Sequence, residues 1–330
     1  MLNSHVSFGY GNCGNDLLKM KRFVQGRDEA DWVRVWNAAY EEYIDIRRIT
    51  VDEFRIAEKA PAFDSEGRFI IEKDEKPVGI IHAHVDKLRK EKKGFIRSFG
   101  ILPEYRNKGL ENQLAETALR ELKNRGMETV QAWARETRKD RIELWKSLGF
   151  KLVRKFSLMK TDLNRLPSDI DENEEVILKQ LRKDSDQDLR ILNWLGNECF
   201  KEHFNFRRGS IEETKHFLRK DPFFKVQDWY FAISKKKHVG YIGVGIDENY
   251  NQERKAKCGW ILDIGVLKSH RRKDIGTKLM LQGLETLKVQ GMTTAMLGVD
   301  DWNVTKAMKL YEKVGFYVEK KDLTYERSVV

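Results

Sequence analysis

The sequence has few cysteines, few prolines and no long hydrophobic stretch, and each shortage excludes a class of protein. Its three cysteines, Cys13, Cys199 and Cys258, are too few and too scattered for a disulfide framework or a cysteine-based metal site. No apolar run approaches the roughly 18 residues that a membrane-spanning helix needs. Residues 1–20 lack the basic start and the apolar stretch of a signal peptide. We therefore expect a globular cytoplasmic protein with no membrane association.

Charge is plentiful, and it is biased towards the positive sign. The 330 residues include 62 Lys and Arg against 52 Asp and Glu, which gives a formal net charge of +10. This excess favours polyanionic partners, namely nucleic acid, an anionic membrane surface or a phosphate-bearing cofactor. The basic residues nevertheless form short runs, such as 87–93 and 235–237, between strand-like segments. We expect these runs to be solvated hairpin tips, and nucleic acid is the less favoured partner.

An internal repeat with an offset of 165 residues organises the chain. Residues 100–102, 106–108 and 126–127 return in similar form as residues 265–267, 271–273 and 291–292. Ordered landmarks at one offset predict a duplicated domain, which fits a length of about two typical domains. A proline and an acidic run between the copies are typical of a linker. We predict four segments: a flexible N-terminal segment 1–16, a first copy 17–165, a linker 166–175 and a second copy 176–330.

Each copy shows the same order of helix-like and strand-like patterns. Amphipathic helices are expected at 28–43 and 50–58 in the first copy, and at 186–202 and 210–219 in the second. Strand-like runs follow, and the third run, 95–102 or 259–267, leads into a basic turn and a helix that should end at Gly126 or Gly291. Strands before, between and after helices predict an α/β or α+β fold with a mixed sheet.

The basic turn is the segment best suited to chemistry. Residues 271–277 (RRKDIGT) lie where a strand ends and a helix begins. A helix N-terminus carries unpaired N–H groups and the positive end of the helix dipole, so it attracts phosphate groups. A small residue such as Gly276 lets the backbone approach an anion closely.

These residues resemble the GNAT N-acetyltransferase superfamily. Residues 271–277 are similar to its Arg/Gln-x-x-Gly-x-Gly/Ala motif, and residues 297–316 to its strand, Asn, helix and Leu-Tyr-Glu-x-x-Gly-Phe ending. The tandem arrangement, with residues 202–206 ahead of the second core, is similar to mycothiol-synthase-like double acetyltransferases. The resemblance implies two GNAT-like domains, each with a mixed, mostly antiparallel twisted sheet flanked by helices. It also implies acetyl transfer from acetyl-CoA, without a metal, to a small-molecule amine or a protein N-terminal amine.

The resemblance also implies the residues that hold acetyl-CoA. They are the end of the third strand and the following turn of the second copy, with part of the matching turn in the first: Ile264, Gly265, Val266, Arg271, Arg272, Lys273, Asp274, Ile275, Gly276, Thr277, Arg106, Lys108 and Gly109. Two departures place a carboxylate beside the expected pyrophosphate. Asp274 replaces the first glycine of the motif in the second copy, and Glu111 replaces the last small residue in the first.

The distal motif distinguishes the copies. The second copy has Asn303 and Tyr311 where the first has Thr137 and Trp145. In the family, a phenol at this place is the general acid that protonates the departing thiolate, which a tryptophan cannot do. We therefore predict that the first copy is catalytically degenerate and that Tyr311 acts in the second.

Other roles keep alternatives open. The general base is Asp263, Asp300 or a water relay that needs neither, and Asn303 either orients a ligand or caps a helix beginning at Val304. His203 has either a substrate-binding or a structural role. His82 and His84 share one strand face, but no third ligand is found at a suitable spacing, so we expect no metal site. A non-catalytic CoA-binding or scaffold protein is the alternative function, and the oligomeric state is left open.

Overall fold

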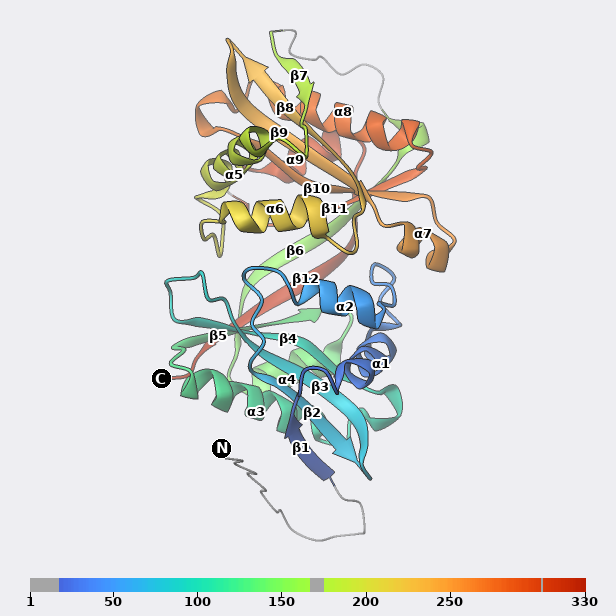
Figure 1. Ribbon diagram of the computed structural model, residues 1–330, viewed down its shortest axis with the longest axis vertical. Helices are drawn as coiled ribbons and strands as arrows, with labels where there is room; N and C mark the ends of the chain where they lie inside the picture. The colour runs from blue at the N-terminus through green and yellow to red at the C-terminus, as the bar shows by residue number, and fades with distance from the viewer. Residues whose placement is uncertain (1–17, 167–174, 304) are drawn as a thin grey trace.

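The structure is a computed structural model that describes residues 18–166, 175–303 and 305–330. The expected N-terminal segment 1–16 and most of the linker 166–175 lie outside the described residues. No described helix is long and apolar enough to cross a membrane. The described chain forms two lobes stacked along the long axis, one for each copy, as Figure 1 shows.

The first copy contains the expected alternation of helices and strands. Its elements are β1 (Leu18–Arg22), α1 (Glu29–Tyr40), α2 (Val51–Ala57), β2 (Arg68–Lys73), β3 (Lys76–Val85), β4 (Lys93–Ile101), α3 (Leu110–Asn124), β5 (Thr129–Arg135), α4 (Lys139–Ser147) and β6 (Lys151–Asp162). The two early helices lie within the predicted ranges. Thr50 begins α2 with a capping box, because its side chain accepts from the N–H of Glu53 while the Glu53 carboxylate accepts from the Thr50 N–H.

The second copy repeats this order. Its elements are β7 (Ile177–Gln180), α5 (Asp186–Phe200), α6 (Ile211–Lys220), β8 (Val226–Ser234), β9 (Lys237–Ile246), α7 (Glu248–Arg254), β10 (Cys258–Val266), α8 (Ile275–Val289), β11 (Thr294–Asp300), α9 (Ala307–Lys313) and β12 (Tyr317–Ser328). The short helix α7 was not predicted. Gly126 and Gly291 end α3 and α8 with φ of +78° and +83°, which confirms the predicted left-handed caps.

One sheet of 12 strands runs through both lobes, with the order β1-β2-β3-β4-β5-β12-β6-β11-β10-β9-β8-β7. The last strand of each copy is exchanged: β12 pairs with β5 of the first copy, and β6 pairs with β11 of the second. In Figure 1, β6 and β12 cross together between the lobes. Most pairings are antiparallel, and β4–β5 and β10–β11 are parallel, which confirms the mixed, mostly antiparallel sheet. The boundary between the copies in the sequence therefore does not correspond to a boundary in the sheet.

The exchange also joins the two hydrophobic cores. Leu323 and Tyr325 of β12 are buried in the first core, with α3, and Met159 of β6 is buried in the second, with α8. Neither copy of the sequence completes its own core. Both copies are therefore expected to unfold together.

The backbone confirms the repeat at the basic turn. Asn107 and Arg272 have φ of 59° and 61°, and the N-cap residues Gly109 and Asp274 are both left-handed, with φ of 80° and 53°. Asp274 thus occupies a conformation that favours glycine.

Both basic runs are hairpin tips, as predicted, and one of them also contacts the other lobe. The run 235–237 is the expected tight turn between β8 and β9, with positive φ at Lys235 and Lys236. In the run 87–93, however, the Arg89 side chain is only 7% exposed and donates to the carbonyl of Asn205 in the other copy at 2.6 Å. Most of this run is exposed, as predicted, and Arg89 also connects the two lobes.

Candidate active site

The main cavity of the second copy opens where two parallel strands separate. β10 and β11 pair only from Cys258 to Trp260 and from Thr294 to Met296, and no further pairing joins them among the described residues. A cavity of about 870 Å³ lies between the strands and extends over the N-terminus of α8 and along α9. The N–H of Leu267 donates to Val239 of β9, so the alternation of the strand turns the N–H of Val266 towards the cavity. An amide donor is therefore available at the cavity floor.

The predicted cofactor segment of the second copy lines this cavity almost completely. Ile264, Gly265 and Val266 form the strand side, and the helix side is made by Arg271, Arg272, Asp274, Ile275, Gly276 and Thr277. Lys273 is the one predicted residue of this copy outside the lining. Lysines from the opposite wall add positive charge that the sequence did not predict: Lys306, Lys309 and Lys313.

The first turn of α8 is a suitable place for a phosphate group. Its opening N–H groups, at Ile275, Gly276 and Thr277, have no acceptor within the helix. A Cβ on Gly276 would lie 3.2 Å from Cδ2 of Leu310. The donor set of backbone amides beside cationic side chains fits a pyrophosphate such as that of acetyl-CoA.

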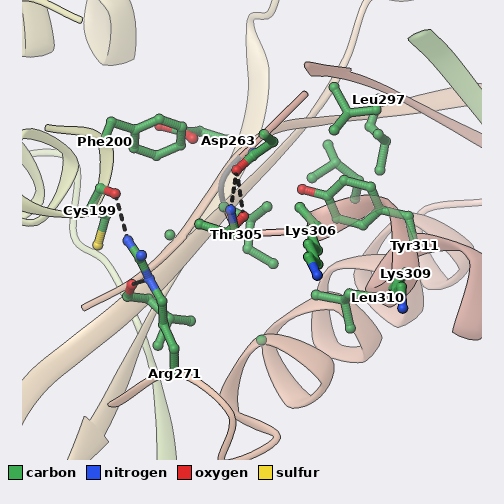
Figure 2. Close-up of a pocket in the computed structure, with 18 of the residues that line it drawn as sticks. Cys199, Phe200, Asp263, Arg271, Leu297, Thr305, Lys306, Lys309, Leu310 and Tyr311 are labelled. Atoms are coloured by element: carbon green, nitrogen blue, oxygen red, sulfur yellow. Dashed lines mark hydrogen bonds between the residues drawn. The ribbon is translucent and has the colours of Figure 1, made fainter. Parts of the chain in front are cut away.

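Arg271 lines the cavity, but its guanidinium is engaged with the protein itself. Its Nε donates to the carbonyl of Val266 at 3.0 Å, and its Nη2 donates to the carbonyl of Cys199 at 3.0 Å (Figure 2). In the first copy, Arg106 bonds the carbonyls of Ile101 and Ala39 in the same way. The conserved geometry shows an arginine that ties the end of the third strand to an early helix in both copies.

The Asp274 carboxylate is exposed and does not cap α8. Among the described residues its side chain makes no capping hydrogen bond; it is 58% exposed and lies 3.9 Å from Nζ of Lys313. The predicted conflict with a pyrophosphate is thereby reduced, because the charge is solvated and faces a cation.

Replacing Asp274 with glycine is expected to tighten acetyl-CoA binding several-fold. Glycine removes a nearby negative charge, and its freedom at φ of 53° should add up to about 1 kcal/mol to the free energy of unfolding. Calorimetric titration and thermal unfolding measure the two effects. Asp274→Asn is the control, since it removes the charge but not the Cβ. Weaker binding by the glycine variant would show that the carboxylate assists binding.

Tyr311 lies on α9 and points its hydroxyl into the cavity, towards the region of Asp263 and Thr305 (Figure 2). The residue is 7% exposed, and no hydrogen bond to its hydroxyl is present among the described residues. Burial and the charge of Asp263 raise the pKa of Tyr311 well above its ordinary value, so the phenol stays protonated at neutral pH.

Asp263 is the better placed of the two predicted bases. It lies on β10 at the cavity floor, and its Oδ2 accepts a hydrogen bond of 2.6 Å from the hydroxyl of Tyr241. Burial raises its pKa to about 6, against the lowering effect of Tyr241 and the N–H of Ile264. A carboxylate with this pKa is mostly ionised at pH 7 and is basic enough to accept a proton.

Asp300 and Asn303 line the same cavity but are held by neighbouring residues. Oδ2 of Asp300 lies 3.2 Å from Nε of Arg154, and Oδ1 of Asn303 accepts from both the N–H and the hydroxyl of Thr305, each at 2.7 Å. The predicted helix start at Val304 is wrong, because α9 begins at Ala307 with Lys306 as its N-cap. Asn303 thus stabilises a turn before α9 and does not cap the helix.

His203 lines the part of the cavity where aromatic rings form the wall. Its ring centroid is 4.4 Å from that of Phe200, and Phe156 lines the same cavity. Burial and Arg271 keep the pKa of His203 below its usual range, so the imidazole is neutral at pH 7. Phe156 comes from β6, so the exchanged strand of the first copy contributes to the cavity of the second.

The corresponding place in the first copy is filled by its own side chains. The space there is about 10 Å³. Arg141 lies over the Phe99 ring at 3.7 Å and donates to the Phe99 carbonyl at 3.2 Å, while Oε1 of Glu111 accepts from the N–H of Asn107 at 3.2 Å. The Glu111 carboxylate thus occupies a backbone N–H of the turn, that of Asn107, which a pyrophosphate would need. Of the predicted first-copy residues, Arg106 lines this small space.

The two histidines on one strand do have an acidic neighbour, which the sequence spacing did not reveal. Asp64, His82 and His84 are all buried, and their possible ligand atoms lie within 4.8 Å of one another. Both Asp64 oxygens are already bound by Arg125, at 2.8 and 2.9 Å, and one also accepts from the N–H of Val85 at 2.8 Å. The Arg125 guanidinium would therefore compete with a cation for this carboxylate.

Comparison with known proteins identifies the family. A model of the acetyltransferase (GNAT) family matches residues 32–150 and again residues 189–316. The chain belongs to the GNAT acetyltransferase family. The two separate matches confirm the predicted tandem arrangement.

Relatives and solved structures agree with this family. The chain is 29% identical over 135 residues to a mycothiol acetyltransferase of Thermomonospora curvata, and the match spans 41% of this chain and 44% of the relative. It is 24% identical over 244 residues to a mycothiol acetyltransferase of Actinosynnema mirum, spanning 74% of this chain and 78% of the relative. The T. curvata match thus spans less than half of that relative's length.

Two solved structures show the same fold over nearly the whole chain. A tandem GNAT protein from the clavulanic acid biosynthesis pathway superposes with a TM-score of 0.74 at 13% identity, covering 95% of this chain and 99% of that chain. A GCN5-related N-acetyltransferase from Sphaerobacter thermophilus superposes with a TM-score of 0.70 at 18% identity, covering 94% and 96%. At these identities the likeness shows the fold alone.

Several residues in or next to the GNAT cavity were not found from the sequence. Tyr241 and Cys199 lie beside Asp263, and Arg154 and Phe156 reach the site from β6. Tyr241 lies on β9 and pairs with Gly265 of β10, so it is close to Asp263 only through the sheet. No sequence signal pointed to β6, because strand exchange between copies leaves no local pattern.

Proposed function

We propose that the protein is an acetyl-CoA-dependent N-acetyltransferase whose reaction takes place in the second copy. The observation that carries this proposal is the contrast between the copies. The second has a large cavity with a helix end suited to phosphate, an ionised carboxylate and a protonated phenol, whereas the space in the first is about 10 Å³ and is lined by Arg141. Family membership supports acetyl-CoA as the acetyl donor.

In the proposed reaction, the nitrogen of a neutral primary amine attacks the thioester carbonyl and forms the amide bond as the carbon–sulfur bond breaks. Asp263 takes the proton that the amine loses, and Tyr311 gives its proton to the departing thiolate. The N–H of Val266 is placed to stabilise the carbonyl oxygen. The two proton transfers assist each other. Once Asp263 is protonated, its negative charge no longer raises the pKa of Tyr311, and the phenol becomes a better acid.

The acceptor is proposed to be a small-molecule primary amine that enters from the side of His203 and Phe156. The aromatic rings at this end of the cavity suit a primary amine with an apolar surface. The name of the relatives, mycothiol acetyltransferase, makes amino-sugar thiols the first acceptors to test. A non-catalytic CoA-binding protein is the second candidate, and the Asp274 charge beside the expected pyrophosphate is the observation that favours it.

The decisive experiment measures thiol release from acetyl-CoA with a panel of amines between pH 5 and 9. Because the base must be ionised, kcat/KM should fall about tenfold per pH unit below the pKa of Asp263, which is about 6. Asp263→Asn should remove this acid limb. The variant should also be more stable than wild type at pH 8, since it lacks a buried charge. Binding of acetyl-CoA without thiol release for any amine would favour the non-catalytic alternative.

A further inference from the structure

Asp263 does not stand alone at the cavity floor, because a second buried side chain determines how its carboxylate is held. The Tyr241 hydroxyl donates to Oδ2 of Asp263 at 2.6 Å, and Tyr241 is 1% exposed. Its hydroxyl faces the carboxylate from β9, whereas Tyr311 faces it from α9. Tyr241 is therefore a partner of Asp263 that a bound substrate does not reach.

The surroundings of Tyr241 are built to hold its ring in one place. A Cβ on Gly265 would lie 2.8 Å from Cε1 of Tyr241, and a Cβ on Gly196 of α5 would lie 3.4 Å from its hydroxyl. On another side, the ring of Trp229 stacks on it with centroids 6.3 Å apart and an interplanar angle of 21°. The two glycines thus leave room for the Tyr241 ring, and Trp229 packs against the ring. This packing fixes the direction of the Tyr241 hydroxyl.

The first copy supplies an internal comparison. Ile80 pairs with Gly100 there in the register in which Tyr241 pairs with Gly265. At the repeat offset of 165 residues, Ser98 stands in the place of Asp263. The phenol and the carboxylate are thus present together in the copy with a cavity and absent together from the filled copy. If the phenol served only to pack β9 against β10, its presence would not be expected to depend on that of the carboxylate.

We propose that Tyr241 is the positioning residue of the general base: its hydroxyl holds Oδ2 of Asp263, orients Oδ1 for the substrate and favours the ionised carboxylate. This inference rests on the proposed role of Asp263. Tyr241 itself does not touch the reacting atoms. The other groups facing Asp263 are the phenol of Tyr311 and the thiol of Cys199, which has the Arg271 guanidinium behind it.

Replacing Tyr241 with phenylalanine tests the proposal, because the stacked ring is kept and only the donor is lost. A hydrogen bond to a charged acceptor favours the charged form, so its removal should raise the pKa of Asp263 by about one unit. The acid limb of kcat/KM should move to higher pH by the same amount, with a five- to tenfold loss at pH 6 and little loss at pH 8.5. A merely structural role would lower the rate equally at all pH values.

Tyr40→Phe is the matched control, since Tyr40 is a buried phenol of the filled copy that donates to the Phe99 carbonyl at 3.1 Å. It should leave the pH profile unchanged. A second readout needs no activity. Stability should decrease as pH rises through the pKa of folded Asp263, and this decrease should extend to higher pH in Tyr241→Phe and be absent from Asp263→Asn.

The two possible failures can be told apart. If Asp263→Asn keeps the wild-type rate and acid limb, the base of the proposed function is wrong. If Asp263→Asn removes the limb but Tyr241→Phe leaves both the limb and the pH dependence of stability where they are in wild type, the positioning role of Tyr241 is wrong. A limb shifted in Tyr241→Phe but not in Tyr40→Phe supports the proposal.

Discussion

Tyr311→Phe is expected to lower kcat about a thousandfold while acetyl-CoA binds within about twofold of wild type. The phenol is buried and stays protonated, and it is directed towards the cavity region where Asp263 lies (Figure 2). Its hydroxyl makes no hydrogen bond among the described residues, so the substitution breaks no structural contact. The loss should therefore appear in the chemical step, measured as thiol release at saturating substrates, and not in the melting temperature.

Tyr325→Phe is the control for this prediction. Tyr325 is a buried tyrosine of β12 that packs in the first core, away from the cavity, so loss of its hydroxyl should leave kcat unchanged. If Tyr311→Phe retained more than about a tenth of the wild-type kcat, a water molecule or another group would have to protonate the thiolate. The assignment of Tyr311 as general acid would then be wrong.

Comparison of the two halves of the sequence predicted the repeat. Local patterns predicted the early helices and the basic turn, because each depends on residues close in the chain. Gly126 and Gly291 are helix ends that only glycine suits, and such positions can be recognised from sequence alone. The turn 271–277 could also be placed, because strand, turn and helix follow one another directly. The place of this segment, between the end of β10 and the start of α8, was predictable for the same reason.

The parts that were missed depend on contacts between distant segments. Asp64 is close to His82 only in the folded chain. Arg154 contacts Asp300 only because β6 and β12 are exchanged between the copies. An exchanged strand has the same alternation of residues as one that pairs within its own copy, so periodicity cannot distinguish the two arrangements. The first turn of α9 was misplaced because Asn303 bonds Thr305 and delays the helix to Ala307.

Gly276→Glu is expected to weaken acetyl-CoA binding at least about 100-fold. The first copy already shows the effect of a carboxylate at this position of the repeat. Glu111 stands 165 residues before Gly276, and its Oε1 accepts from the N–H of Asn107. A glutamate at 276 should bind the N–H of Arg272 in the same way, and its charge would repel a pyrophosphate at the first turn of α8. Calorimetric titration with acetyl-CoA measures the loss.

The reciprocal variant decides whether binding belongs to one copy. Glu111→Gly should leave acetyl-CoA affinity and stoichiometry unchanged, because Arg141 still fills the gap between β4 and β5 and donates to the Phe99 carbonyl. A Cβ at 276 would lie 3.2 Å from Cδ2 of Leu310 and 3.9 Å from Cγ2 of Val266, both of them side-chain methyl groups. We therefore expect Gly276→Glu to fold, and a melting temperature will verify this. If Gly276→Glu still bound acetyl-CoA tightly while Glu111→Gly gained a second site, the turn of the second copy would not be the one that determines binding. Loss in Gly276→Glu and constancy in Glu111→Gly would instead show that acetyl-CoA binds at the turn of the second copy, and that the first copy lacks the space as well as the free turn.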